Sequence, residues 1–337
     1  MTATKDTRSV EEAEREAQDL MKAAAISAKP LMNELAELEG FLAADPDQNT
    51  KNKRASFHIV LIALYSYGSF SVHSLGSLLR SKGYKVSYVF FKEAQTNGMG
   101  LPEEEEYKLL QKLLAGLSPD LIGLSFMSAF APAAKEITKL ARPFDVPIVW
   151  GGAHAVDASD DSIEHADIVC LGDGEFPLLK LANAMTNGES YDDIKNLGFN
   201  NNGQTKKNEL YPLLQNLDLV PFPIFGDADK YSIDHNKLNY GDPHYIKELS
   251  WYNIMTGRGC PYSCTFCSNS FLNENFKGKG NILRRRSVDN VIEELVIAKN
   301  RFPQLVGVSG NDEVFILQRD WLVEFAKKYK KEINIPF

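Results

Sequence analysis

The sequence predicts an α/β protein: a doubly wound, five-stranded parallel sheet of flavodoxin-like order, followed by a second and shorter α/β unit. Two observations predict this fold. Short apolar runs alternate with amphipathic helical stretches from about residue 57 to 187, and the same alternation begins again near residue 250. The five runs of the first unit are Ile59 to Tyr65, Val86 to Phe91, Leu121 to Ser125, Ile148 to Trp150 and Ile168 to Leu171.

Length and charge limit the classes of protein to which the chain can belong. Its 337 residues, 44% of them hydrophobic, suffice for two ordinary domains with their own cores. A formal net charge of -8 argues against a general binder of nucleic acid or of membrane surfaces, since both favour clustered positive charge. No apolar run reaches the roughly 18 residues that a membrane span needs, and the N-terminus lacks the apolar segment of a signal peptide. We therefore expect a cytoplasmic protein.

The pattern divides the chain into four parts. Residues 1–54 carry Glu, Ala, Lys and Leu at helical spacing and predict a helical leader without chemistry of its own. Residues 55–187 hold the first sheet. Residues 188–248 are rich in Asn, Asp, Pro and Tyr, with weak periodicity, and predict a connecting segment. Residues 249–337 hold the second α/β unit.

The second unit reads as alternating strands and helices. Apolar runs at Tyr252–Met255 and Leu305–Val308 predict two strands, and helices are expected from about 287 to 300, with Ser287 as N-cap, and from about 320 to 330. The final residues, 333–337, predict a third strand.

Three thiols cluster just after the first strand of this second unit. Cys260, Cys264 and Cys267 are spaced C-x3-C-x2-C, and thiolates are the ligands of iron–sulfur clusters. Three ligands leave one iron of a cubane open. The alternative, a structural zinc site, needs a fourth ligand, and the closest upstream histidine, His244, lies sixteen residues before Cys260. The fourth cysteine, Cys170, lies in an apolar run and reads as a plain buried residue.

This loop resembles the signature of the radical S-adenosylmethionine superfamily, C-x3-C-x-aromatic-C, with Phe266 in the aromatic place. The resemblance implies that Cys260, Cys264 and Cys267 hold a 4Fe-4S cluster and that S-adenosylmethionine chelates its fourth iron. Phe266 would then lie against the adenine, although a simple packing ring explains it too. The unit would be the start of a radical S-adenosylmethionine (βα) barrel.

An acidic pair follows the second apolar run of this unit. Superfamily members often carry a Gly-Gly-Glu-like element there that touches the amino group of the cofactor, and this chain has Asp312 and Glu313. A carboxylate facing an ammonium group is physically sensible. Both acids are candidates for this contact, with a solvated loop acid as the alternative. The arginine run 284–286 could meet an anionic substrate, but a charge run is more often a solvated face.

The loops at the carboxyl ends of the first sheet's strands are where such a sheet binds its ligand. Here they resemble those of the cobalamin-binding domain often found before a radical S-adenosylmethionine barrel, over residues 57 to 187. Glycines in these loops permit close approach of a flat ligand, although each also serves ordinary turns. The candidate cofactor-binding residues are Ser125 and Met127 after the third strand, Gly151 and Gly152 after the fourth, and Gly172, Gly174 and Glu175 after the fifth.

A histidine ligand for cobalt is not expected. The methionine-synthase type of this domain supplies histidine from D-x-H-x-x-G, and this chain has Ser71 in place of the aspartate before His73. Without that carboxylate the imidazole lacks the partner that would orient it. We therefore expect that His73→Ala leaves the cobalt spectrum unchanged, and His154 is a second weak candidate for lining the site.

The resemblance implies a cobalamin-dependent radical S-adenosylmethionine enzyme that uses a 4Fe-4S cluster, S-adenosylmethionine and cobalamin. Methyl transfer to an unactivated carbon of a small-molecule substrate is the leading reaction, with an electron donor such as a flavodoxin or ferredoxin as partner. The alternatives are a radical oxidative cyclase or ring-rearranging enzyme on the same cofactors, and a non-catalytic fragment. The chain is expected to lack later barrel strands and to turn over poorly alone, and no residue is assigned as catalytic.

Overall fold

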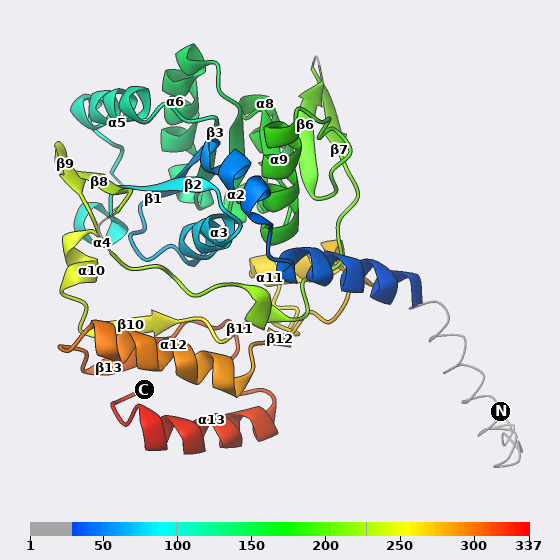
Figure 1. Cartoon of the computed structure of the whole chain (residues 1–337), viewed down its shortest axis with the longest axis vertical. Coiled ribbons are helices and arrows are strands. Elements are labelled where there is room, and N and C mark those ends of the chain that lie inside the picture. The colour runs from blue at the N-terminus through cyan, green and yellow to red at the C-terminus, as the bar shows by residue number, and fades with distance from the viewer. Residues whose placement is uncertain (1–28, 99, 202, 227) are drawn as a thin grey trace, which may run out of the picture.

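A nine-stranded sheet organises the first part of the chain. The computed structural model describes residues 29–98, 100–201, 203–226 and 228–337, and Figure 1 shows their arrangement. The strand order is β7-β6-β5-β4-β3-β1-β2-β8-β9. Its centre consists of the five predicted strands in the flavodoxin-like order β2-β1-β3-β4-β5, all parallel, so the predicted fold class is confirmed. These strands are β1 (His58–Leu64), β2 (Lys85–Phe91), β3 (Leu121–Ser125), β4 (Ile148–Gly151) and β5 (Ile168–Cys170).

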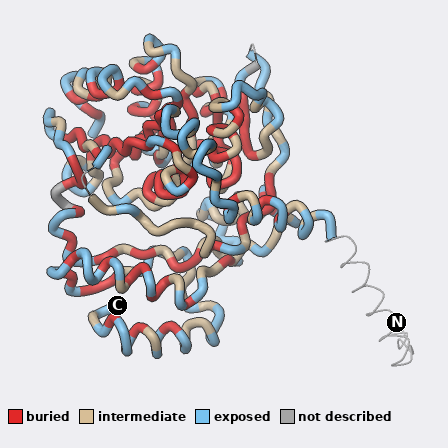
Figure 2. The backbone as a smooth tube through the Cα atoms, in the orientation of Figure 1, coloured by how far each residue is buried: buried red, intermediate tan, exposed pale blue. Residues whose placement is uncertain are grey.

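Helices cover both faces of this sheet because successive side chains of a strand point to opposite faces. Along β1, Ile59 and Leu61 pack with α3 and α9, whereas Val60 and Ile62 pack with α5 and α6. The strand is therefore buried at every position. Figure 2 shows the buried centre of the sheet. The helices of this part are α2 (Gln48–Ala55), α3 (Phe70–Ser81), α4 (Ala94–Asn97), α5 (Glu104–Leu117), α6 (Ala131–Ala141), α7 (Ala153–Asp157), α8 (Ser159–His165) and α9 (Glu175–Asn187).

The predicted connecting segment needs a correction, because it adds four strands to the first sheet as well as joining the two units. β6 (Leu197–Asn201) and β7 (Gln204–Lys207) extend one edge, and β8 (Lys230–Asp234) and β9 (Lys237–Tyr240) extend the other. The β8–β9 hairpin turns at His235 and Asn236, both with positive φ, as a tight two-residue turn requires. Such short edge strands carry little hydrophobic periodicity, which is why the sequence did not reveal them.

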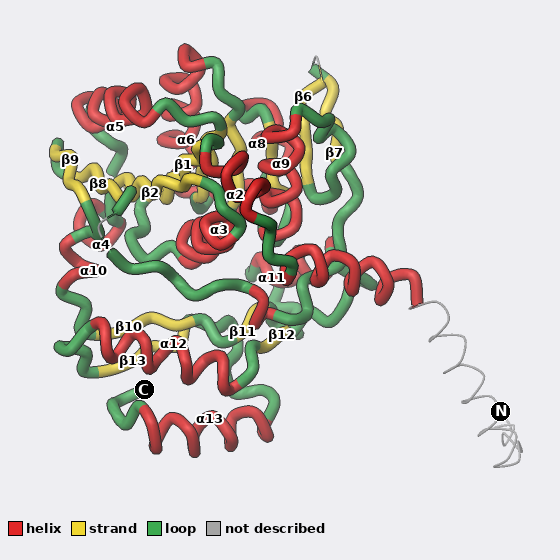
Figure 3. The backbone as a smooth tube through the Cα atoms, viewed as in Figure 1, coloured by secondary structure: helices red, strands yellow, loops and turns green. Residues whose placement is uncertain are grey.

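The second unit is a smaller layer of strands and helices below the first sheet (Figure 3). β10 (Trp251–Ile254) pairs in parallel with β13 (Gly307–Gly310), and α12 (Val288–Arg301) and α13 (Arg319–Glu332) pack on that pair, as the sequence predicts. Ser287 is the N-cap of α12. Three further elements are α10 (His244–Lys247), α11 (Ser268–Asn275) and the short antiparallel pair β11 (Gly257–Arg258) with β12 (Arg284–Arg285).

The predicted third strand at residues 333–337 is wrong. The α13 helix continues to Glu332, and Ile333 packs fully buried against the core of this unit. Asn334 has a positive φ, which breaks an extended run. One hydrogen bond, from the Val308 N–H to the Pro336 carbonyl at 2.9 Å, holds the segment beside β13.

The predicted helical leader is helical at residues 29–43 and in α2, while residues 1–28 lie outside the described part of the chain. Leu38 and Leu42 of the first helix are buried against the core that α3 and α9 share. The described half of the leader is therefore a structural support for the first sheet.

Candidate functional site

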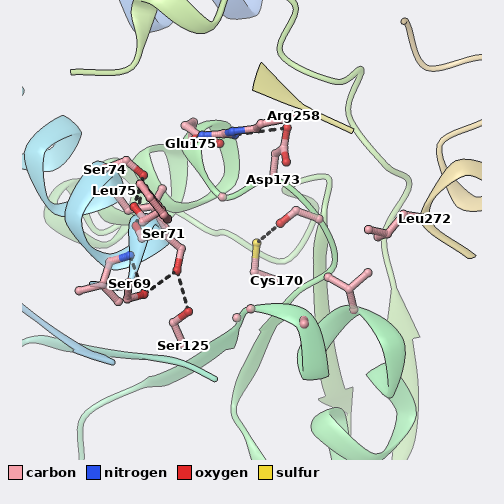
Figure 4. Close-up of a pocket in the computed structure, with 18 of the residues that line it drawn as sticks. Ser69, Ser71, Ser74, Leu75, Ser125, Cys170, Asp173, Glu175, Arg258 and Leu272 are labelled. Atoms are coloured by element: carbon pink, nitrogen blue, oxygen red, sulfur yellow. Dashed lines mark hydrogen bonds and ion pairs between the residues drawn. The ribbon is translucent and has the colours of Figure 1, made fainter. Parts of the chain in front are cut away.

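A cavity of about 550 Å³ lies at the carboxyl edge of the central strands, where the second unit covers them. Its walls come from the loops after β1, β3, β4 and β5 on one side and from α11 on the other. Figure 4 shows it in close-up. The cavity brings together every first-unit residue that the sequence proposes for cofactor binding: Ser125, Met127, Gly151, Gly152, Gly172, Gly174 and Glu175.

Two adjacent glycines at the end of β4 form part of the cavity wall in different ways. Gly152 has φ +88°, and a Cβ there would lie 2.8 Å from both the N and O atoms of Phe126. The backbones of two loops therefore meet where a side chain cannot fit. A Cβ on Gly151, by contrast, would have no atom closer than 3.9 Å. Gly151 thus leaves open space at the cavity wall.

Serine hydroxyls form the polar part of this wall. Ser71 Oγ lies 2.8 Å from Ser125 Oγ and 3.2 Å from Ser69 Oγ, as Figure 4 shows. Ser69 is also the N-cap of α3. Sequence reasoning missed Ser69 and Ser71 as site residues, although serines at the start of a helix that follows a parallel strand are a usable signal.

Cys170 is buried, as predicted, but it also lines the cavity. Its thiol donates to the Gly172 carbonyl at 3.5 Å. Burial raises the pKa of this thiol to about 12. The thiol is therefore neutral at physiological pH and contributes an uncharged surface to the cavity.

Glu175 does not project freely into the cavity. One of its oxygens, Oε1, accepts a hydrogen bond from Arg258 at 2.7 Å, and Arg258 Nη1 lies 3.6 Å from Asp173. Arg284 forms a second, closer ion pair with Asp173. Burial alone would raise the pKa of Asp173, but the two guanidinium groups outweigh burial and lower it. The loop after β5 is thus ion-paired to the strands that flank the cysteine loop.

The cysteine loop joins β11 to α11. At its start Gly259 has φ +87°, and a Cβ there would lie 2.2 Å from the Ile282 carbonyl oxygen, so only glycine fits. Asn273 of α11 donates to the Cys260 carbonyl at 2.8 Å, and the Cys267 N–H donates to the Cys264 carbonyl at 3.1 Å. The loop is therefore anchored at both ends and tied to its own helix.

The three thiols of this loop are free. Cys264 is exposed, and Cys260 and Cys267 are partly exposed. Within the described ranges, no three His, Cys, Asp or Glu side chains are arranged to share a metal ion. Three accessible thiols on one anchored loop have the donor chemistry of an iron–sulfur site. Cluster binding at these cysteines stays a prediction, as does the adenine contact of Phe266, whose ring is 91% exposed.

The two candidate acids of the second unit have different surroundings. The Asp312 carboxylate accepts hydrogen bonds from the Thr256 N–H at 2.6 Å and from Arg285 at 2.8 Å, and its side chain is almost fully buried. It holds the end of β10 against the loop after β13. Glu313 instead lines the cavity. The structure therefore places only Glu313 where a cofactor can reach it.

His73 belongs to α3, and its buried side chain does not line the cavity. Its ring packs 5.1 Å from the ring of Phe90, and its Nε2 donates to the Tyr67 carbonyl at 3.1 Å. Burial lowers the pKa of His73 to about 4, so the ring is neutral at physiological pH. His154 is also buried, between Ser128 at 3.1 Å and Asp161 at 3.2 Å, and does not line the cavity.

Comparison with known proteins shows which domain the cavity-forming loops resemble. The B12 binding domain family matches residues 60–182, which supply the loops of the first wall. The radical S-adenosylmethionine methyltransferase TsrM of Kitasatospora setae, solved with cobalamin and a [4Fe-4S] cluster, superposes with a TM-score of 0.63 at 17% identity, over 82% of this chain and 52% of that one. Residues 60–182 thus match a B12 binding domain, and the chain shares the fold of this methyltransferase.

Two curated relatives are similar to parts of this chain. An uncharacterised methyltransferase of Pyrococcus horikoshii is 28% identical over 240 residues, which are 69% of this chain and 48% of that protein. The anaerobic magnesium-protoporphyrin IX monomethyl ester cyclase of Cereibacter sphaeroides is 27% identical over 173 residues, 48% of this chain and 26% of that protein. The chain thus spans less than half of the length of each of these relatives. In the described part of the chain no helix has the length and apolarity to cross a membrane.

The different surroundings of Asp312 and Glu313 predict different effects of neutralising each acid. Glu313→Gln should leave the free energy of unfolding unchanged and weaken S-adenosylmethionine binding about tenfold, because one charge-assisted contact is lost. Asp312→Asn should instead cost about 2 kcal/mol of stability, because it weakens buried hydrogen bonds. Chemical unfolding and equilibrium dialysis of both variants provide the check. Equal loss of stability in the two variants would contradict the assignment.

The neutral, buried His73 predicts acid sensitivity. Its pKa of about 4 in the folded protein lies below the ordinary histidine value of 6.5, so the unfolded chain binds more protons than the folded one as the pH falls between these values. Stability is therefore lost on the acid side, by about 2 kcal/mol between pH 7.5 and pH 5 from this residue. In His73→Gln the loss over this range should shrink by that amount, measured by urea unfolding at both pH values. An unchanged difference between the two pH values would show that His73 is not responsible.

Proposed function

We propose that this protein is a cobalamin-dependent radical S-adenosylmethionine enzyme that binds cobalamin in the cavity and a 4Fe-4S cluster with S-adenosylmethionine at the cysteine loop. Its proposed reaction is methyl transfer to an unactivated carbon of a small molecule. One observation carries the proposal. The cavity has the loops of the B12-binding domain as one wall and α11, which starts immediately after Cys267, as the other. Two cofactors held at these places would lie next to each other.

The residues of the cavity suit a large, mostly apolar ligand with polar edges. The absent side chain of Gly151 leaves room for the ligand at the wall, while the serines offer hydroxyl groups that can donate or accept. The Cys170 thiol is neutral and adds no charge. Fixed backbone and hydroxyl groups of this kind orient a cofactor while the cofactor carries the hard chemistry.

The residues at the cysteine loop suit a cluster and its ligand. Cys260, Cys264 and Cys267 would supply the three thiolates, and Glu313 would accept a hydrogen bond from an ammonium group. When bound, the cluster and S-adenosylmethionine supply radical chemistry, and cobalamin supplies the methyl group. An electron donor such as a flavodoxin or ferredoxin, and a cytoplasmic location, belong to the same proposal.

The test is a measurement of iron, sulfide and cobalamin in anaerobically purified and reconstituted protein, followed by an assay for reductive cleavage of S-adenosylmethionine. Iron, sulfide and cobalamin bound together support the proposal. Stoichiometric zinc without iron, or no cobalamin, would refute it.

A second reaction has support from one comparison. The Cereibacter relative bears the name of a cyclase, so the same two cofactor sites would also suit an oxidative cyclisation. Product analysis with a labelled methyl donor separates the two: label in the product indicates methyl transfer, and an unlabelled, oxidised product indicates cyclisation.

The cavity assignment predicts the effect of filling the open space at Gly151. Gly151→Leu should fold, because no atom lies within 3.9 Å of the new Cβ, yet should weaken cobalamin binding at least about tenfold by occupying the wall. Equilibrium dialysis with hydroxocobalamin measures this. The matched control is Gly116→Leu, on the exposed side of α5 with no atom within 4 Å, which should bind normally. Equal affinity in both variants would place cobalamin elsewhere.

A further inference from the structure

Arg258 lies between the two proposed cofactor sites. It is the last residue of β11, two positions before Cys260, and its side chain lines the cavity. Its guanidinium group donates to Glu175 at 2.7 Å and lies 3.6 Å from Asp173, and both acids belong to the loop after β5 of the B12-binding domain. The start of the cysteine loop is thus attached by charge to the wall of the cobalamin cavity.

The closer of the two acids, Glu175, is hidden from water. The Glu175 side chain is only 3% exposed, and its second oxygen, Oε2, is buried without a hydrogen-bond partner among the described residues. Burial alone would lower the pKa of Arg258, but the two carboxylates outweigh burial. The net effect raises the pKa above its ordinary value, so the residue stays charged. Glu313, on the same cavity, also acts on this charge. The charge of Arg258 therefore interacts with acids of the first unit and with an acid of the second unit.

Filling the cavity should change this attachment. Water that reaches the cavity weakens an ion pair at its wall, whereas a ligand that displaces the water lowers the local dielectric constant and strengthens the pair. A stronger pair fixes the position of Arg258 and, through two residues of backbone, that of Cys260. In the reverse direction, a cysteine loop held in place by its cluster completes the wall that the ligand contacts.

We propose that Arg258 is a positioning residue that couples the two sites. Cobalamin then binds more tightly when the cysteine loop holds its cluster, and the cluster binds more tightly when cobalamin fills the cavity. This inference rests on the proposed function. Coupling between two sites is reciprocal, and typical coupling factors lie between about 5 and 150. We expect the reconstituted protein to bind hydroxocobalamin about tenfold more tightly than the cluster-free protein.

The experiment compares this affinity ratio in four variants by equilibrium dialysis under anaerobic conditions, with iron content measured on the same samples. In Glu175→Gln and Arg258→Met the ratio should fall to within about twofold of one, because the charge pair is absent. Arg258→Lys keeps the charge but not the two-pronged geometry and should restore part of the ratio. The control, Asp161→Asn, removes a carboxylate that pairs with Lys135 away from the cavity and should keep the full ratio.

The outcomes are distinguishable. A wild-type ratio within twofold of one, or an undiminished ratio in Glu175→Gln, overturns the coupling while leaving both cofactor sites intact. Absence of cobalamin binding in both forms of the wild-type protein overturns the proposed function and the coupling with it. Should Arg258→Met fail to fold, Glu175→Gln decides alone, because glutamine keeps the size and the acceptor oxygen of the original side chain.

Discussion

Reconstituted wild-type protein should contain about four irons and four sulfides per chain, and each of Cys260→Ala, Cys264→Ala and Cys267→Ala should lose them together. The physical reason is that three thiolates are the minimum set that anchors a cubane with one open iron. The loop itself should survive these changes, since its anchors are backbone contacts of Gly259 and the Asn273 bond to the Cys260 carbonyl rather than the thiols. Iron analysis and the visible absorption of the cluster provide the measurement.

The internal control for this prediction is Cys170→Ala. That thiol is buried at the cavity wall, and its pKa is raised to about 12, so it is not a thiolate that could take part in ligation. Its removal should leave the iron content at the wild-type value. Loss of iron in Cys170→Ala, or its retention in any of the three loop variants, would contradict the ligand assignment.

The sequence predicted the central sheet because burial on both faces leaves a clear trace. Every residue from His58 to Leu64 is buried, so β1 appears as a continuous apolar run. The loops that end these strands could then be assigned to one edge of the sheet by topology alone. This is why all seven candidate residues of the first unit line one cavity, although they lie as far apart in sequence as Ser125 and Glu175.

Features that depend on tertiary pairing could not be predicted in this way. Edge strands such as β7 and β9 expose most of their side chains and so carry no periodic apolar signal. Asp312 and Glu313 are neighbours with the same charge, and only the position of Arg285 and Thr256 in space shows which of them is engaged. The ion pair of Glu175 with Arg258 joins residues 83 positions apart.

A large effect of a single added methyl group on the fold is expected at Gly152. This residue has φ +88° and ψ -174°, a region of backbone space that is essentially restricted to glycine. An added Cβ would also lie 2.8 Å from the N and O atoms of Phe126 and 3.1 Å from Ser125 Oγ. Two of these atoms belong to the Phe126 backbone. Two hydrogen bonds hold this backbone against the loop after β4: the Phe126 N–H donates to the Gly151 carbonyl, and the His154 N–H donates to the Phe126 carbonyl. The loop cannot yield without breaking these bonds.

Gly152→Ala should therefore cost about 4 kcal/mol of stability, the sum of backbone strain and this close contact, and should also abolish cobalamin binding. The matched control is Gly188→Ala at the end of α9, which also has a positive φ, of +70°, but has no atom within 4 Å of the new Cβ. It should cost only about 1 kcal/mol, because the left-handed conformation is the whole penalty there. Urea unfolding of the two variants measures the difference. Equal losses would mean that the loops after β3 and β4 can separate, and that the cavity wall is not fixed by the contact between Gly152 and Phe126.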